Sequence, residues 1–207
     1  MSRPANSFSR RGAVYAPQPT VLVLCEDLKS SKSYLESLAK HHRAIVKVVF
    51  DHCGNTDPLG IVREAKRCKG NYEQVYCVID RDTHHNFDQA IDYAKAVGVN
   101  MVVSYPCFEF WLLLHFGYNR RPYMASGSRS AGDQVVAELR RSPGMHNYQK
   151  GSKTDWFAFL LDRYETAKRN AARSLQDAQR DEEPNPSTEL HNLILVIEEL
   201  SQPKPLV

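Results

Sequence analysis

The segment "VYCVIDRD", residues 75–82, is an apolar run that ends on two carboxylates. The run 75–80 has the composition of a buried strand and ends at Asp80, and Asp82 follows two positions later. An unpaired charge beside a core is unfavourable, so acids need a reason to lie there. In a parallel α/β sheet the functional edge lies at the carboxyl ends of the strands, which gives that reason.

Strands and helices alternate around this segment. Three further apolar runs predict strands, at residues 20–27, 44–50 and 99–105. Helices are predicted between and after the strands, at 31–41, 58–69 (with Asp57 as N-cap), 86–97 and the apolar 107–116. Fourfold alternation with helical crossovers predicts an α/β fold, a Rossmann-type parallel sheet with helices on both faces.

The chain beyond residue 116 has a different pattern. A Gly/Arg/Ser-rich loop precedes three predicted helices, near 132–141, over about 20 residues from Thr154, and at 187–200 with Ser187 as N-cap. We therefore divide the chain into three parts. They are a flexible N-terminal arm (1–19), an α/β core (20–116) and a mainly helical C-terminal region (117–207) packed on the core.

Composition excludes several classes of protein. The 207 residues are 42% hydrophobic, and no apolar run approaches the roughly 18 residues that a membrane span needs. No signal-peptide segment is present, so we expect a cytoplasmic protein. The five cysteines are scattered without zinc-site spacing, which indicates reduced thiols.

Charge is unevenly distributed along the chain. The formal net charge of +3 combines +6 over residues 117–180 with −5 over 181–207. A basic block of this kind can collect phosphate groups, and a solvated helix surface has the same composition. Both interpretations stay open from the sequence alone.

Three acids at two strand ends suggest a metal site. Glu26 follows the first strand, and Asp80 and Asp82 follow the third, so right-handed crossovers bring them to one edge. Mutual repulsion there favours a hard cation such as Mg²⁺, which prefers carboxylate oxygens. Alternatively, Asp80 caps the next helix and Asp82 is solvated.

The same positions carry a family resemblance. A glutamate after strand one and D-x-D after strand three resemble the Toprim domain of topoisomerases, primases and certain nucleases, with Asp27 in place of the usual glycine. Further segments between residues 21 and 200 together resemble the RloB family of Toprim-like proteins, namely "VLCEDLKSSKSYLESL", "VIDRD", "SYPCFEFWLLLHF", "YQKGSKTDWFAFL" and "EEPNPSTELHNLILVIEEL". The resemblance implies a role in bacterial defence against phage, as a nuclease controlled by an ATPase of the ABC or overcoming-lysogenization-defect type.

The resemblance also implies roles for individual residues. Glu26 becomes the candidate general acid/base, and Asp80 and Asp82 become ligands of Mg²⁺ or Mn²⁺. Glu109 matches the "PCFE" stretch, and we expect it either to start a helix facing the site or to pair with an arginine, because a buried unpaired glutamate is rare. His84 is a further catalytic candidate from its place after the D-x-D, although such histidines are often polar surface.

Basic residues supply the candidate contacts to nucleic acid, either DNA or RNA. A cluster at 148–156 combines lysines with a glycine and aromatic residues, although an ordinary loop has the same features. The candidate nucleic-acid-binding residues are Lys29, Arg81, Arg120, Arg121, Lys150 and Lys153.

The sequence therefore predicts a metal-dependent nuclease, with two alternatives. One is a non-catalytic scaffold subunit of a defence complex, because fold does not fix function. The other is a receiver-type signalling domain, which would use the lysine of "PKP" (203–205). No Walker-type motif is present, so an ATP-driven step needs a second protein, and the oligomeric state stays open.

Overall fold

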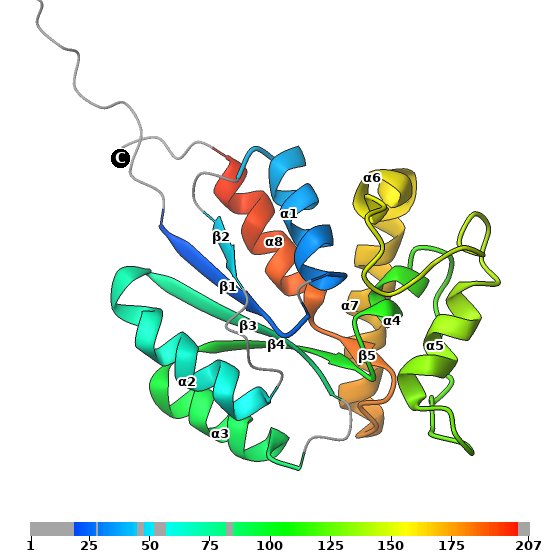
Figure 1. Cartoon of the computed structure of the whole chain (residues 1–207), viewed down its shortest axis with the longest axis horizontal. Helices are drawn as coiled ribbons and strands as arrows, with labels where there is room; N and C mark the ends of the chain where they lie inside the picture. Colours follow the sequence, from blue (N-terminus) through cyan, green and yellow to red (C-terminus); the bar gives the residue numbers. More distant parts are fainter. Residues whose placement is uncertain (1–18, 28, 45–47, 52–56, 82–84, 203–207) are drawn as a thin grey trace, which may run out of the picture.

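A computed structural model describes residues 19–27, 29–44, 48–51, 57–81 and 85–202, and Figure 1 draws the remainder as a thin grey trace. Asp82 and His84 therefore lie outside the described residues, as does most of the expected N-terminal arm. Of residues 48–50 only the backbone is described.

Five strands form one sheet in the order β2-β1-β3-β4-β5. Their bounds are β1 Val21–Cys25, β2 Val48–Asp51, β3 Gln74–Asp80, β4 Asn100–Tyr105 and β5 Ser187–Thr188. The pairs β1–β2, β1–β3 and β3–β4 are parallel, whereas β5 pairs antiparallel with β4. The predicted parallel α/β sheet is confirmed.

Helices α2 (Pro58–Cys68) and α3 (Phe87–Val97) lie side by side on one face of this sheet (Figure 1). Asp57 caps α2 as expected, because its Oδ2 accepts the Gly60 N–H at 2.8 Å. Alternate strand residues such as Leu22, Leu24 and Ile79 pack with these helices into one apolar core.

The opposite face carries a larger core and most of the C-terminal region. Helices α1 (Ser31–His41) and α8 (Leu190–Ser201) cover the sheet there (Figure 1). The same core takes in α4 (Glu109–Leu113), α5 (Ala131–Leu139), α6 (Trp156–Leu160) and α7 (Tyr164–Asp181). Small residues at helical spacing on α7, such as Ala167 and Ala171, are fully buried and so let neighbouring helices approach closely.

Strand order fixes where a site can form. The chain leaves β1 toward β2 on one side, and then crosses to β3 on the other side of β1. The carboxyl ends of β1 and β3 therefore flank the topological switch point, where open α/β sheets bind their ligands. Glu26 follows β1 directly, and Asp80 is the last residue of β3.

Three helices differ from the sequence-based expectations. The long helix from Thr154 is wrong as a single element, because α6, a 3-10 turn (Leu161–Arg163) and α7 share that stretch. Ser187 is not an N-cap, because it pairs with Tyr105 in β5 and the last helix begins at Leu190. The helix expected over 107–116 is the short α4, and all five of its residues are buried.

The structure does not support the alternative of a receiver-type signalling domain. It needs a further buried strand carrying the site lysine, whereas β5 has two residues and runs antiparallel. The "PKP" lysine itself lies outside the described residues. Among the helices that the structure describes, none has the length and apolar character of a membrane span.

Candidate active site at the carboxyl edge of the sheet

Two of the predicted acids are joined directly at the switch point. The Glu26 N–H donates to the Val78 carbonyl at 3.1 Å, which continues the β1–β3 ladder one residue past the strand. The Asp80 N–H in turn donates to Glu26 Oε2 at 2.9 Å. The side chain of one predicted site residue thus holds the backbone of the other.

Asp80 lies in an acidic and partly enclosed environment. Its Oδ1 accepts the Phe108 N–H at 2.9 Å, so it also fixes the chain just before α4. Burial is the main cause that raises the pKa of Asp80 well above its usual value, and the negative charges of Glu109 and Glu26 raise it further. Lys150 and the Phe108 N–H act in the opposite direction.

Glu109 is the buried centre of a second group of contacts. It is the first residue of α4 and only 2% exposed. Its Oε1 accepts the Tyr148 hydroxyl at 2.9 Å, and its Oε2 lies 3.2 Å from Lys150 Nζ. The glutamate therefore starts a helix at the site as one expectation had it, and its cationic partner is a lysine instead of an arginine.

Lys150 and Tyr148 reach this position on a loop of the C-terminal region. The Gly151 N–H donates to Ser30 Oγ at 3.2 Å, which ties the loop to the turn after β1. Burial lowers the pKa of Lys150, but the attraction of the negative charges of Glu109 and Asp80 outweighs it and leaves the pKa raised. Lys150 is consequently a fixed positive charge beside the acids.

Asp27, at the position where the resemblance to Toprim domains predicts a glycine, has a structural role. Its two carboxylate oxygens accept the N–H groups of Lys29 at 2.9 Å and of Ser30 at 2.6 Å. Its carbonyl accepts the Ser31 hydroxyl at 3.3 Å. The aspartate thus organises the turn between β1 and α1 with hydrogen bonds.

A cavity of about 320 Å³ opens beside Asp80 and Lys150. The chain after β4, the loop before α5 and the first turn of α5 form its walls. Its lining residues include Asp80, Arg81, Tyr105, Cys107, Tyr123, Met124, Ser130, Gly132, Lys150 and Asn185. Burial raises the pKa of the Cys107 thiol well above its usual value, and Glu109 and Asp80 add to the shift, so this cysteine is a neutral core thiol as expected.

The described residues alone do not complete a metal site. Within ranges 19–27, 29–44, 48–51, 57–81 and 85–202, no three His, Cys, Asp or Glu side chains gather closely enough to hold an ion. Glu26 and Asp80 lie together, and the predicted third ligand, Asp82, belongs to a stretch that is not described. Binding of Mg²⁺ or Mn²⁺ stays a prediction.

The candidate nucleic-acid contacts fall into different environments. Arg81 lines the cavity, with its guanidinium 4.3 Å from the centre of the Phe87 ring and 3.8 Å from Asp88. Lys29 is exposed, and its aliphatic stem packs against Gly151, a residue with a φ of +73°. Lys153 is exposed as well.

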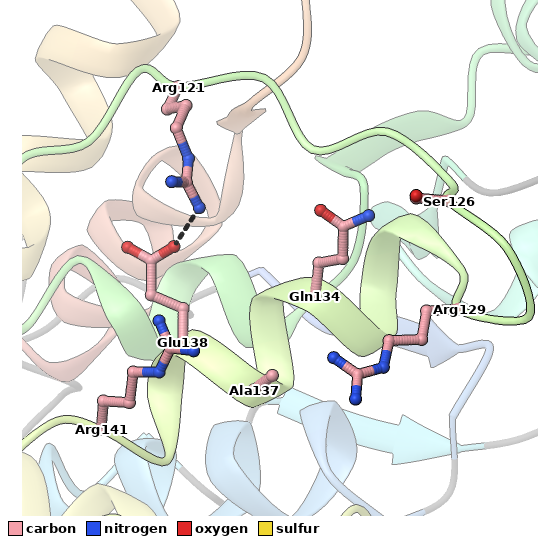
Figure 2. A pocket seen from close by; sticks show the side chains of 7 residues that line it. All are labelled: Arg121, Ser126, Arg129, Gln134, Ala137, Glu138 and Arg141. Atoms are coloured by element: carbon pink, nitrogen blue, oxygen red, sulfur yellow. Dashed lines mark hydrogen bonds and ion pairs between the residues drawn. The ribbon is translucent and has the colours of Figure 1, made fainter.

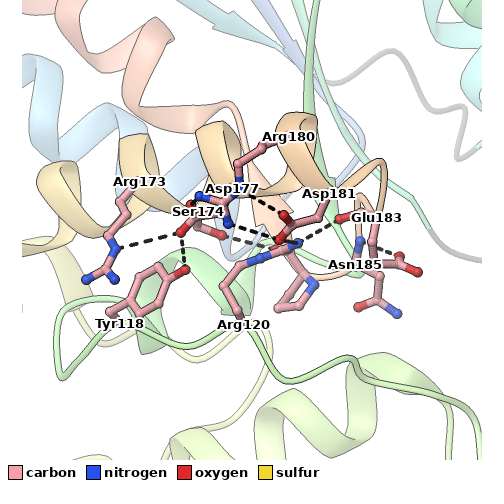
Figure 3. A network of polar contacts seen from close by, with 10 residues as sticks. Tyr118, Arg120, Arg173, Ser174, Asp177, Arg180, Asp181, Glu183 and Asn185 are labelled. Atoms are coloured by element: carbon pink, nitrogen blue, oxygen red, sulfur yellow. Dashed lines mark hydrogen bonds and ion pairs between the residues drawn. The ribbon is translucent and has the colours of Figure 1, made fainter.

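Arg120 is instead part of an internal network (Figure 3). Its guanidinium donates to the carbonyls of Pro186 at 2.5 Å and Glu183 at 2.9 Å, and it lies 3.9 Å from Asp181. Only 15% of the side chain is exposed. These contacts join the loop after α4 to the chain after α7, so we leave Arg120 out of the proposed phosphate contacts.

Tyr148 is the residue whose place the sequence analysis missed most clearly. It belongs to the 148–156 cluster that the sequence offers for contact with nucleic acid, yet it is 1% exposed and its hydroxyl donates to Glu109. The two residues are 39 positions apart, so no local pattern could have paired them. The only available signal was the need of a buried glutamate for hydrogen-bond donors.

Fold and site together define an α/β protein with an acidic switch-point site completed by a lysine from its C-terminal region. A sequence model of the family described as RloB-like protein matches residues 21–197, and the chain belongs to that family. The match runs through the sheet, the acidic edge and the C-terminal helices into α8. No curated protein and no solved structure matches the chain.

Proposed function

We propose that this RloB-like chain hydrolyses phosphodiester bonds of DNA or RNA with a divalent metal ion, as a defence nuclease under the control of a partner ATPase. The observation that carries the proposal is the bond between Glu26 and the Asp80 backbone at the switch point, with Glu109 and Lys150 beside it. An acid with a shifted pKa that lines a cavity, as Asp80 does, is typical of active sites. Defence and the ATPase partner rest on the family resemblance.

The acids suit a magnesium-type ion chemically. Mg²⁺ uses one or two carboxylates and completes its shell with water and phosphate oxygens. Glu26 and Asp80 would provide these carboxylates, with Asp82 as the predicted third ligand. When bound, the ion would supply charge stabilisation on a phosphoryl oxygen and lower the pKa of a coordinated water.

The chain's own residues account for the remaining needs of hydrolysis. Glu26 would take the proton from the attacking water or give one to the leaving oxygen, because it lies beside Asp80 at the carboxyl edge of the sheet. Lys150, fixed by Glu109, would attract a phosphate into the cavity. Glu109 is buried and does not line the cavity. It can therefore orient Lys150 and leave the cavity open for the phosphate.

One observation favours the scaffold alternative. Lys150 already places a positive charge near Asp80 and partly opposes the rise in the pKa of that carboxyl. An internal cation reduces the need of the acids for a metal ion. A subunit of this kind would bind phosphate at the same edge and leave the chemistry to another protein.

The decisive experiment incubates the chain with plasmid DNA and total RNA, with Mg²⁺ or Mn²⁺, in the presence and absence of the neighbouring gene's product. We expect cleavage by the wild type and its loss in Glu26→Gln and in Asp80→Asn. Asp92→Asn, an exposed acid on α3, is the matched control and should cleave like the wild type. Cleavage that persists in Glu26→Gln would refute the mechanism.

Calorimetry separates the nuclease from the scaffold. The double variant Asp80→Asn, Asp82→Asn should lose Mn²⁺ binding that the wild type shows. Equal Mn²⁺ affinity in both proteins would refute the predicted metal site. Phosphate binding without metal binding would support the scaffold alternative.

A further inference from the structure

A basic surface lies along α5 and the loop that precedes it. One hollow of about 460 Å³ is lined by Arg121, Arg129 and Arg141 together with Ser126, Gln134, Ala137 and Glu138 (Figure 2). A second hollow of about 550 Å³ shares Arg121, Glu138 and Arg141 with it and continues past Phe116 and Tyr118. The shared residues make the two hollows one groove, which we call the α5 groove.

Positive charge in the α5 groove exceeds negative charge. Of the five arginines and two acids of residues 117–141, the groove is lined by three arginines (Arg121, Arg129 and Arg141) and one acid, Glu138. Glu138 is already engaged, because it pairs with Arg121 at 3.2 Å and accepts the Tyr123 hydroxyl at 2.9 Å. Asp133, the other acid, accepts the N–H of Ser130 at 2.9 Å and caps its own helix.

The arginines themselves are presented to solvent. Arg129 and Arg141 are exposed, and the Arg121 side chain is 72% exposed although it pairs with Glu138. Figure 2 shows Arg121 on the loop facing the helix, with Arg129 and Arg141 near its two ends. Arginine forks of this kind suit the oxygens of phosphate groups.

The α5 groove and the cavity at Asp80 are built by one loop and one helix. Tyr123, Met124 and the first turn of α5 line the cavity, whereas Arg121, Arg129 and the later turns of α5 line the groove. From Ala131 to Leu139, α5 extends about 12 Å at 1.5 Å per residue. A ligand longer than one nucleotide can therefore occupy both surfaces.

We infer that the α5 groove binds the phosphodiester backbone of a nucleic acid strand whose neighbouring segment enters the cavity beside Asp80. This inference rests on the proposed function for the identity of the ligand. It makes the substrate an extended strand, held at a distance from the site of cleavage by contacts that do not read sequence.

The test is binding in EDTA, so that no metal-dependent cleavage intervenes. Fluorescence anisotropy follows single-stranded DNA and RNA of the same sequence, and the two arms identify which strand is preferred. For Arg121→Gln, Arg129→Gln, Arg141→Gln combined, we expect affinity to fall roughly tenfold to hundredfold at about 0.1 M salt. The slope of log affinity against log salt should become shallower by about 2, from about 0.7 for each lost contact to a single strand.

Two matched variants make the result specific. Arg63→Gln, Lys66→Gln, Arg67→Gln on α2 removes the same charge from the opposite face of the sheet, and its affinity should stay within about twofold. The Arg→Lys triple at 121, 129 and 141 should keep most of the salt dependence, because charge is retained. Thermal melting confirms that each variant folds.

Several outcomes overturn the inference. They are equal losses in the groove and α2 variants, no loss in the groove variant, or equal binding of a polyglutamate peptide. If the wild type binds and cleaves nucleic acid while the groove variant does so unchanged, only the groove fails. If the wild type binds neither DNA nor RNA, both the groove inference and the proposed function fail.

Discussion

The two faces of the sheet are built on different principles. Under α2 and α3 the core is entirely apolar, and no buried polar side chain of the described residues belongs to either helix. The opposite face buries Glu109, His115, Ser174, Asn185 and His191 among its apolar residues. Each buried polar group needs a partner, so that face demands contacts between distant segments. One face supplies stability, and the other also supplies the charges and hydrogen bonds of the site.

The largest loss of stability is expected from a substitution in the core on the apolar face of the sheet. Ile79→Ala removes a fully buried side chain from the core under α2 and α3 and should lower the free energy of unfolding by about 4 kcal/mol. Urea denaturation measures the loss, which should be the same at pH 7.5 and pH 5 because that core contains no carboxyl or imidazole group. A loss that changes with pH would mean that the two faces are coupled.

A pH-dependent contribution to the free energy of unfolding is expected from His115, on the face with buried polar groups. His115 is 1% exposed, its Nε2 lies 3.2 Å from the Tyr34 hydroxyl, and burial lowers its pKa from 6.5 to about 4. The unfolded chain binds a proton at 6.5 and the folded chain does not, so this contribution to stability is complete above pH 6.5 and is lost between pH 6.5 and about 4. The shift corresponds to about 3 kcal/mol.

The measurement is the difference in unfolding free energy between wild type and His115→Gln across that pH range. Other groups titrate in both proteins and cancel in the comparison. A constant difference from pH 7 to pH 4 would contradict the burial argument.

The buried ion pair should have an intermediate effect. Lys150→Met leaves Glu109 without its cation and should cost about 2 kcal/mol, less than the roughly 3–5 kcal/mol of a fully buried pair. The reduction follows from the lysine side chain, which is 53% exposed. A double-mutant cycle with Glu109→Gln should show that the two losses are not additive. Additive losses would mean that the pair does not interact.

The smallest effect concerns the turn after β1. Asp27→Ala removes the acceptor of the Lys29 and Ser30 N–H groups and should cost about 1 kcal/mol, whereas Asp27→Asn should retain part of the stability. Chemical denaturation measures both. If the alanine variant is as stable as the wild type, the aspartate is not organising the turn.

The sequence predicted the sheet well because parallel strands are buried on both faces and read as continuous apolar runs. It also predicted that Glu26 and Asp80 would meet, since strand order alone brings those ends together. Contacts to the C-terminal region could not be predicted. The bond from Tyr148 to Glu109 and the carbonyl partners of Arg120 depend on how a loop packs, and periodicity carries no information on that.

Short elements were the other failure. Two residues of β5 are too few for a strand pattern, and Ser187 ahead of an apolar run has the composition of a helix N-cap. Tertiary pairing with β4 overrode that local signal.

The pairing of β5 has a consequence for self-association. An open strand edge is a template for another chain, and native sheets protect such edges. Ser187 and Thr188 cover Tyr105 and Ser104 of β4, and Glu189 continues the protection, because its N–H donates to the Val103 carbonyl and its Oε2 accepts the Val103 N–H, both at 2.9 Å. A side chain thus replaces a third strand residue. Displacing this stretch would expose the β4 edge to aggregation, so the segment between α7 and α8 protects the sheet as well as connecting two helices.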